Sequence, residues 1–486
     1  MAAFWAVMNA PADYDYWWHL ADGRFIAQRH RLPVPDPFSF TAEGRRWTAH
    51  EWLLELVMYR LHLAFGVAGP LILFALCAAA TLLLSAALWR HVGLAWPWTT
   101  TLLVALFLAL APFRGPRPYL AGLLLLGLYC WVVERWTSQA GRRIWALPPL
   151  VYLWANVNAS FVVALLATGL VLVADTLGSR GIPSLRSRFT PTQRVQLGLV
   201  LGISTAIAAL TPNGPRLLVF PFTTLSDPSL RSISEWQASP PLRSEMWGVD
   251  VICVLLLATL FLRRPRLSGA DLALTLAMAV AAFSSVRLVG VASMYLAFLA
   301  TRALTAPGQP VCLRLPGGGA LGRWWHARAS LYESPPLRLQ AINGLAMLVT
   351  CVIGVGRLHL YSEHTDARLP GAAVETLGAD GLSGPLFHDF NWGGYLLWRL
   401  WPHVRVFIDG RQNDLYDGTG RELQQYIQIT SITAESEHML DRHGIRTILF
   451  KKDTPLVRYL LARGGWSVTY DDGVVVRLER SNGDSP

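Results

Sequence analysis

The chain has 486 residues, of which 53% are hydrophobic and 15% are charged, and its formal net charge is +10. Soluble globular proteins carry about 25% charged residues, so this composition excludes an ordinary soluble domain and favours a chain that crosses a membrane several times. The positive charge does not indicate a nucleic-acid partner, because no soluble segment alternates basic and aromatic residues; it fits arginine-rich cytoplasmic loops instead.

Long apolar runs predict a mainly α-helical, polytopic membrane protein. A helix needs about 20 apolar residues to cross a bilayer, and the sequence holds about ten such runs. Segment 1–10 is apolar but too short to cross, and it is typical of the last half of one further helix. The predicted spans lie near residues 68–89, 97–113, 119–134, 145–157, 159–178, 195–211, 247–263, 268–285, 288–304 and 339–358.

The arginines predict the orientation of these spans. When the loop 11–67 is placed outside the cytoplasm, the arginine-rich loops fall inside, as the positive-inside rule requires. Those basic loops are residues 135–144, 179–194, 263–267 and 305–338. We therefore expect a membrane domain at 1–358 and a soluble extracytoplasmic domain at 359–486.

Two soluble parts carry recognisable periodicity. Residues 51–65 place apolar side chains at helical spacing and predict a helix at the membrane interface. The C-terminal domain alternates strand-like and helix-like runs, which predicts a small α/β domain. The strand-like runs are 404–410, 446–450 and 473–480, and the helix-like runs are 420–429, 435–444 and 454–464.

Three arginines in short loops on the predicted outer side, Arg114, Arg117 and Arg287, break the positive-inside pattern. A guanidinium at membrane depth needs an anion, and its planar fork suits phosphate. Each arginine could instead pair with a lipid headgroup or an acidic neighbour. As a set beside acidic residues, they favour a substrate that is a phosphate-bearing lipid.

The stretch after the first apolar segment contains two acids, Asp13 and Asp15, followed by Trp17 and Trp18. In an extended loop, residues two apart share a face, so the two carboxylates could hold a divalent cation or provide a general base. The alternative is an Asx turn or a helix N-cap. The two tryptophans are typical of an interfacial aromatic belt, or could stack on a sugar.

Further polar residues on the predicted outer side are expected to line a substrate pocket. They are His19, His50, Glu51, Asn158 and Glu235. Either histidine could instead be a hydrogen-bonded scaffold. In the C-terminal domain, Trp392 directly precedes two glycines and Asp409 ends a strand-like run, and both are expected to shape the side of the pocket that receives the acceptor. Their alternative is a buried structural turn and salt bridge.

Several segments resemble a group of bacterial multi-spanning membrane proteins that is commonly placed with the GT-C-type glycosyltransferases. These segments read DYDYWWHLADGRFI, LPVPDPFSFTAEGRRWTAHEWLLE, WANVNASFVVAL, TPNGPRLLVFPF, SEWQASPP and FNWGGYLLWRLWPHVRVFIDGRQNDLY. The resemblance implies a polyprenyl-phosphate-linked sugar donor, used on the non-cytoplasmic face. It also implies a catalytic acid in the first outer loop, which Asp13 and Asp15 match. The phosphate-binding role expected of the three arginines is inferred from the topology and not from the resemblance.

The expected function is therefore transfer of a sugar from a polyprenyl-phosphate donor to a glycan, lipid or protein acceptor at the outer face of the membrane. Asp15, or Asp13, would act as the base, and no cofactor is required unless the acidic pair holds a divalent metal. Two other classes stay open. A transporter or flippase of lipid-linked envelope precursors would explain the spans, and a non-catalytic envelope scaffold would explain the outer domain.

Overall fold

The computed structural model describes residues 13–113, 115–139, 141–179, 187–226, 233–265, 267–306, 368–380, 382, 384–413 and 421–481. The chain divides into two compact units. We call the first the helical unit, which comprises Met1–Ala10, Leu71–Leu218 and Ser232–Gly356. We call the second the mixed unit, which comprises Pro11–Pro70, Val219–Arg231 and Arg357–Pro486.

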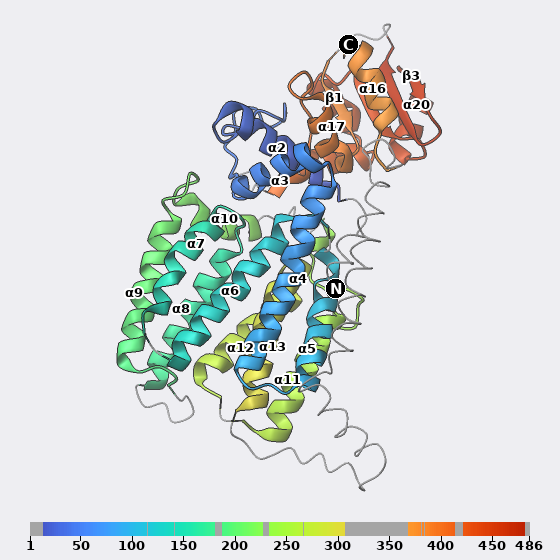
Figure 1. The fold of residues 1–486 in the computed structure, drawn as a ribbon. Coiled ribbons are helices and arrows are strands. Elements are labelled where there is room, and N and C mark those ends of the chain that lie inside the picture. The colour runs from blue at the N-terminus through green and yellow to red at the C-terminus, as the bar shows by residue number, and fades with distance from the viewer. Residues whose placement is uncertain are drawn as a thin grey trace, which may run out of the picture. The chain divides into compact units, whose positions relative to one another are not determined.

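The helical unit is a bundle of helices, several of which run side by side (Figure 1). Its helices are α4 (Ala68–His91, whose first residues belong to the mixed unit), α5 (Trp96–Ala109), α6 (Pro118–Gln139), α7 (Leu147–Ala155), α8 (Phe161–Ser179), α9 (Pro191–Ala208), α11 (Trp247–Arg263), α12 (Gly269–Ser284) and α13 (Val289–Thr305). Each predicted span that falls on described residues is a helix. The predicted span 339–358 and the segment 1–10 lie outside the described residues.

Local sequence signals fix where these helices begin. Thr190 Oγ1 accepts a hydrogen bond from the backbone N–H of Gln193, and the Gln193 side chain accepts one from the backbone N–H of Thr190, which forms a capping box at the start of α9. Ser268 and Asp271 form the same motif at the start of α12. Each box satisfies backbone N–H groups that the first helical turn leaves without partners.

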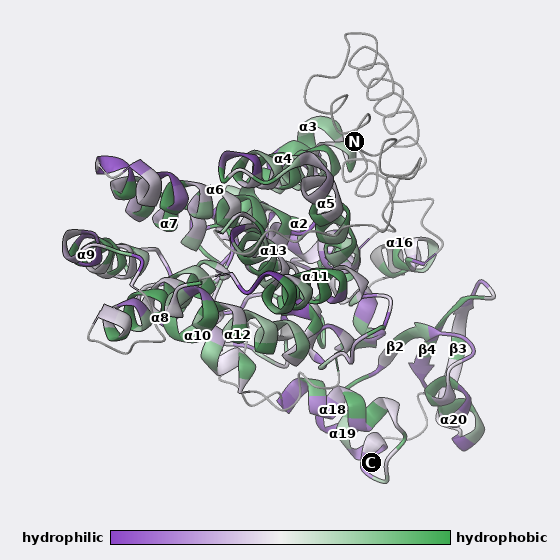
Figure 2. Cartoon of the chain, turned by 90° about the horizontal axis from the view of Figure 1, so that it is seen from below, coloured by the Kyte–Doolittle hydropathy of each residue, from purple (hydrophilic) through white to green (hydrophobic). Residues whose placement is uncertain are grey.

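The outward faces of the bundle are apolar. Four described helices are long and apolar enough to cross a membrane: Ala68–His91, Pro118–Gln139, Phe161–Ser179 and the stretch Val286–Thr305. The side chains of Leu83, Phe261 and Leu276 are 72%, 76% and 67% exposed. Figure 2 shows α4, α5, α11 and α12 as predominantly hydrophobic. So large an exposed apolar surface is unfavourable in water and is typical of helices that contact lipid. The protein therefore lies in a membrane.

The mixed unit combines a four-stranded sheet with short helices. The strands are β1 (Leu386–His388), β2 (Thr447–Lys451), β3 (Trp466–Asp471) and β4 (Val475–Arg480), in the order β1-β2-β4-β3. β1 and β2 are parallel, and the other pairs are antiparallel. The helices are α2 (Asp15–Arg29), α3 (Trp52–Phe65), α16 (Gly371–Asp380), α17 (Gly393–Leu400), α18 (Arg421–Thr430), α19 (Ser436–Arg442) and α20 (Pro455–Arg463). α10 (Arg216–Leu225) continues from the helical unit into this one.

Most elements predicted for the C-terminal domain are confirmed, but the strand predicted at 404–410 is wrong. This segment does not join the sheet; Val406 forms an isolated parallel bridge with Ser39 of the first loop. The Phe40 N–H donates to the Val406 carbonyl, and the Val406 N–H donates to the Phe38 carbonyl. The first loop therefore pairs with the C-terminal chain and belongs to the same compact unit.

Candidate functional site

Asp13 and Asp15 occupy different positions at the start of α2. Asp13 Oδ1 accepts the backbone N–H of Asp15 at 3.1 Å, and the Asp13 carbonyl accepts the N–H of Tyr16. The expected extended loop is therefore wrong, and Asp13 serves the helix start, as the alternative proposed. Asp15 lies in the first turn, half-buried, where the helix dipole stabilises its ionised form.

The carboxylate of Asp15 lies directly against Gly410 of the C-terminal chain. A Cβ atom at position 410 would lie 2.2 Å from Asp15 Oδ1 and 2.7 Å from Trp18 Nε1. A Cβ atom at position 394 would lie 3.0 Å from the backbone nitrogen of Trp18. Two glycines thus let the C-terminal chain approach the acidic end of α2 closely, which explains why the WGG and DGR segments contain them.

Trp17 and Trp18 are packed inside the protein, at 4% and 5% exposure, so the expectation that they form an interfacial belt is wrong. The Trp17 ring meets the Tyr395 ring of α17 edge-on at 5.3 Å. The Trp18 ring lies 3.6 Å from the His19 ring, centroid to centroid. The buried Nε1 of Trp18 has no hydrogen-bond partner among the described residues. It lies beside Asp15 where both approach Gly410.

Arg411 holds the turn that carries Gly410. Its guanidinium binds both carboxylate oxygens of Asp409, with Nε–Oδ1 at 2.9 Å and Nη2–Oδ2 at 2.6 Å. It also binds Asp36 Oδ1 at 2.9 Å and Ser39 Oγ at 3.3 Å, both in the first loop. Arg411, Asp409 and Asp36 have side chains with 0% exposure, and Arg411 also stacks over Phe38.

The electrostatics of this network keep it ionised. Burial alone would lower the pKa of Arg411, but the carboxylates of Asp409, Asp36 and Asp22 raise it well above its ordinary value. Asp409 is therefore a buried structural anchor, which is the alternative that its motif left open. Trp392 is likewise 1% exposed, and its Nε1 donates to the Arg368 carbonyl at 2.9 Å.

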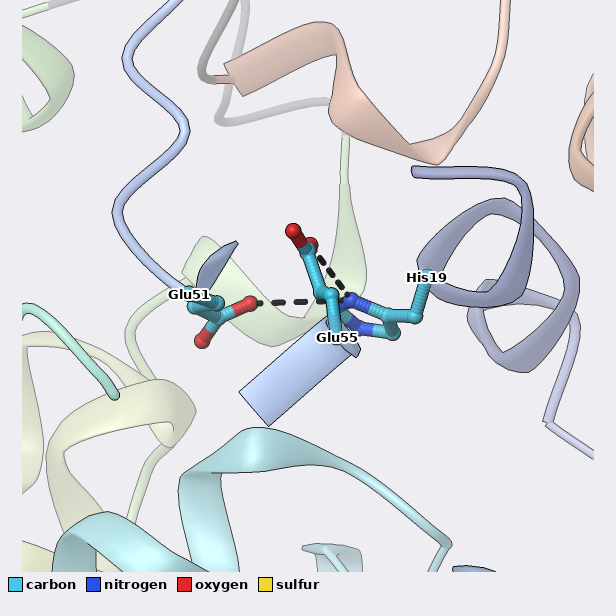
Figure 3. Close-up of side chains that lie close together, drawn as sticks. All are labelled: His19, Glu51 and Glu55. Atoms are coloured by element: carbon cyan, nitrogen blue, oxygen red, sulfur yellow. Dashed lines mark hydrogen bonds and ion pairs between the residues drawn. The ribbon is translucent and has the colours of Figure 1, made fainter. Parts of the chain in front are cut away.

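His19 from α2 meets two glutamates at the start of α3 (Figure 3). Its Nδ1 lies 3.0 Å from Glu55 Oε1 and 3.8 Å from Glu51 Oε2. His50 Nε2 lies 3.6 Å from the other oxygen of Glu51. All four side chains are buried. Three of the residues predicted to line a pocket, His19, His50 and Glu51, are thus brought together, and Glu55 joins them.

Within the described chain, the group of side chains that could hold a metal consists of His19, Glu51 and Glu55, whose ligand atoms lie within 4.8 Å of one another. It does not include Asp13 or Asp15. The use of that acidic pair as metal ligands stays a prediction.

Two of the three predicted arginines share one carboxylate in the helical unit. Arg117 Nη1 lies 2.7 Å from Glu235 Oε1, and Arg287 Nη1 lies 3.4 Å from Glu235 Oε2. Arg287 also lies over the Trp236 ring, at 4.9 Å from its centroid. This cluster, which we call the arginine pair, is partly exposed. Arg114 lies outside the described residues.

Asn158 has a local role at the start of α8. Its Oδ1 accepts the backbone N–H of Ser160 at 3.0 Å, and its side chain is buried. A Cβ atom at Gly122 of α6 would lie 3.0 Å from the same Oδ1, so Asn158 also marks a close approach of two helices. Its predicted contact with substrate stays a prediction.

A comparison with protein-family models gives no match, and a comparison with curated proteins gives none either. Among solved structures, the chain is similar to the archaeal oligosaccharyltransferase AglB from Archaeoglobus fulgidus, solved in complex with an inhibitory peptide and a dolichol-phosphate. The TM-score is 0.50 at 11% identity, over 98% of this chain and 71% of that chain. A second similar structure is ArnT from Cupriavidus metallidurans in the apo state, with a TM-score of 0.48 at 16% identity, over 98% of this chain and 95% of that one.

The fold is that of a GT-C-like membrane protein with a small α/β domain. This confirms the predicted fold class.

Sequence reasoning missed two sets of polar residues. Glu55 lies four residues after Glu51, and this helical spacing could have indicated that both face His19. In the helical unit, Arg188, which was assigned only to a cytoplasmic loop, lies 2.9 Å from Glu134, and Arg302, which falls in the predicted span 288–304, lies 3.3 Å from Asp271. No local signal links these residues, because they come from α6, α12, α13 and the segment before α9.

Proposed function

We propose that the protein is a membrane glycosyltransferase that moves a sugar from a polyprenyl-phosphate donor to an acceptor hydroxyl at the outer face of a bacterial cytoplasmic membrane. The observation that carries this proposal is the half-buried Asp15, held against Gly410 by a buried ion network. The fold similarity to AglB is consistent with it, since that protein was solved with a dolichol-phosphate bound.

In the proposed reaction the acceptor hydroxyl attacks the anomeric carbon of the sugar. A carbon–oxygen bond forms at this carbon while the bond from it to the phosphate oxygen breaks, and the electron pair of that bond leaves with the phosphate. Asp15 takes the hydroxyl proton as general base. Attack opposite the leaving group inverts the configuration of the sugar.

Asp15 is suited to this role by its position. Its carboxylate is half-buried at a helix start, and Gly410 leaves no side chain between it and the neighbouring backbone. The Nε1 of Trp18 lies beside the same glycine, so the close approach of the C-terminal chain constrains both side chains.

Within the helical unit, the arginine pair is the candidate contact for the phosphate of the donor. Arg117 and Arg287 meet at the single carboxylate of Glu235. Their planar guanidinium groups suit phosphate, which can accept charge-assisted hydrogen bonds from both.

The partners that follow are a polyprenyl-phosphate-linked sugar, membrane lipid around the helices, and a glycan, lipid or protein that presents the acceptor hydroxyl. The mixed unit, including the C-terminal domain, would lie on the outer side of the membrane.

The test uses the full chain purified in detergent. Short-chain polyprenyl phosphates carrying mannose, glucose, galactose or aminoarabinose are added with a membrane extract as acceptor source, and release of polyprenyl phosphate is followed by mass spectrometry. We expect one donor to be consumed by the wild type and not by Asp15→Asn, which keeps the size of the side chain but removes the base. Asp453→Asn, at an exposed turn of the same unit, is the matched control.

Other outcomes discriminate the alternatives. Turnover by Asp15→Asn at the wild-type rate would remove Asp15 as base. Movement of the intact donor across a proteoliposome bilayer without release of polyprenyl phosphate would overturn the transferase in favour of a flippase. Binding of no donor in the panel would favour a scaffold.

A further inference from the structure

We propose that the mixed unit contains a divalent transition-metal site formed by His19, Glu51 and Glu55, which binds Mn²⁺ or Zn²⁺. The site does not include Asp15, the base of the proposed transfer step. The ligand atoms would be Nδ1 of the histidine and one carboxylate oxygen from each glutamate.

The distances fit a single cation. Metal bonds of about 2.0 to 2.2 Å to nitrogen and oxygen place neighbouring ligand atoms roughly 3 Å apart and opposite ones about 4 Å apart. Here Nδ1 of His19 lies 3.0 Å from the nearer Glu55 oxygen and 3.8 Å from the nearer Glu51 oxygen. In Figure 3 the imidazole nitrogen faces both carboxylates. A small contraction would bring all three donors onto one ion.

The two glutamates are presented by one short piece of helix. Glu51 is the N-cap residue of α3 and Glu55 lies in its first turn, four residues later. Residues at this spacing lie one above the other on the same helical face. Two carboxylates on one face of a helix can supply two ligands of a metal site without requiring a flexible loop to become ordered.

The histidine is held from the facing helix, and a glycine sets the separation. Gly23 lies four residues after His19 on α2, and a Cβ atom there would be 2.2 Å from the carbonyl oxygen of Glu55. The two helices therefore touch at Gly23, one turn from the histidine. The Trp18 ring, 3.6 Å from the His19 ring, restricts the imidazole further. Preorganised ligands of this kind favour metal binding.

The donor set selects the ion. Imidazole suits Zn²⁺ and other first-row metals, whereas Mg²⁺ and Ca²⁺ are usually held by oxygen ligands alone. Carboxylates suit Mn²⁺ as well as Zn²⁺, and the site offers no thiolate for softer ions. Three protein ligands also leave at least one coordination position for water or another ligand. His50, 3.6 Å from the second oxygen of Glu51, can orient that carboxylate from outside.

A plain hydrogen bond between His19 and Glu55 is the competing explanation, and it predicts no affinity for metal. The test measures affinity directly on the full chain in detergent. Protein stripped with a chelator is titrated with MnCl₂, while electron paramagnetic resonance follows free Mn²⁺, and separately with ZnCl₂ by calorimetry. We expect saturable binding of one equivalent, and a higher unfolding temperature with the ion bound.

Three variants locate the site. His19→Gln, Glu51→Gln and Glu55→Gln should each weaken binding at least about tenfold. Glu43→Gln, at an exposed surface pair of the same unit, should bind as the wild type does. Absence of saturable binding by the wild type at millimolar ion would overturn the proposal without any variant. Unchanged affinity in folded Glu51→Gln and Glu55→Gln would also overturn it.

The outcome is separable from that of the proposed function. Asp15→Asn should bind the ion with wild-type affinity even though it transfers no sugar. Metal binding without any donor turnover would leave the site standing and the transferase proposal in doubt. Donor turnover without metal binding would have the opposite consequence.

Discussion

Asp15 packs directly against Gly410: a Cβ atom at position 410 would lie 2.2 Å from Oδ1 of Asp15. No pair of non-bonded heavy atoms tolerates this distance, so the identity of residue 410 determines where Asp15 can be. A residue at the start of the chain and one near its end are therefore parts of a single local structure.

Gly410→Ala should abolish sugar transfer while the protein remains folded. The added methyl group forces Asp15 and Trp18 away from their positions, at a cost of about 1 to 3 kcal/mol, which is typical of overpacking. Donor turnover and the unfolding temperature in detergent are measured together. Gly384→Ala is the matched control, because the nearest atom to its Cβ would lie at 3.6 Å, an ordinary contact. Wild-type turnover by Gly410→Ala would contradict the assignment of Asp15.

The helices were predictable from the sequence because their signals are local. Apolar runs of membrane length and capping residues such as Thr190 lie within the element that they specify. The segment 404–410 shows the limit. Its strand-like composition predicts an extended chain, which is correct. Its hydrogen-bond partners, however, lie far away in the sequence: the Thr41 hydroxyl donates to the Phe407 carbonyl across 366 residues. Pairing at such a separation leaves no local pattern.

The candidate site was predictable in its residues but not in its grouping. His19, His50 and Glu51 were each expected in a pocket, and the structure places them together with Glu55. Which residue faces which depends on how two helices pack. Asp409 is the opposite case. Its position after an extended segment suggested contact with substrate, but its side chain has 0% exposure and is paired with Arg411.

Breaking the Arg411 network should destabilise the mixed unit strongly. Arg411→Lys cannot reproduce the paired contacts to Asp409 together with those to Asp36 and Ser39. Removal of one partner from a buried ion pair typically costs about 3 to 5 kcal/mol. We expect a clear drop in unfolding temperature, measured by intrinsic tryptophan fluorescence.

The control for Arg411 is an arginine at the surface of the same unit. Arg405→Lys alters an exposed pair with Glu43 and should cost no more than about 1 kcal/mol. Asp36→Asn should resemble Arg411→Lys, because it leaves the same guanidinium short of charge. Equal stability of Arg411→Lys and Arg405→Lys would show that the network does not anchor the fold.

Stability should fall as the pH decreases below about 6.5, and His388 should be one cause. Its Nδ1 donates to the Asp389 carbonyl at 2.9 Å and its Nε2 accepts the Phe407 N–H at 3.2 Å, which fixes a neutral ring. Burial lowers the pKa of His388 below its ordinary value. Below about pH 6.5 the unfolded chain therefore binds a proton that the folded chain does not, and the free energy of unfolding decreases by up to about 1.4 kcal/mol per pH unit.

This decline ends below the lowered pKa of the folded state, where His388 is protonated in both states. Unfolding temperatures measured from pH 7.5 to 5 should show the decline, and His388→Gln should flatten it. His443, whose pKa is also lowered by burial, contributes in the same direction and should remain in the variant. An unchanged slope in His388→Gln would assign the decline to other groups.

The arginine pair should bind the phosphate of the lipid donor. Arg117→Ala and Arg287→Ala each remove one of two guanidinium groups that share Glu235, and loss of charge-assisted hydrogen bonds worth about 1.5 to 3 kcal/mol should weaken binding roughly tenfold or more. Binding of undecaprenyl phosphate is measured by native mass spectrometry in detergent, with undecaprenol as the uncharged comparison. Arg243→Ala, whose side chain is 62% exposed in the same unit, is the control and should bind as the wild type does. Glu235→Gln should bind at least as tightly as the wild type, because it removes the competing anion but keeps both arginines. Equal affinity for the phosphate and the alcohol would rule out these arginines as the phosphate site.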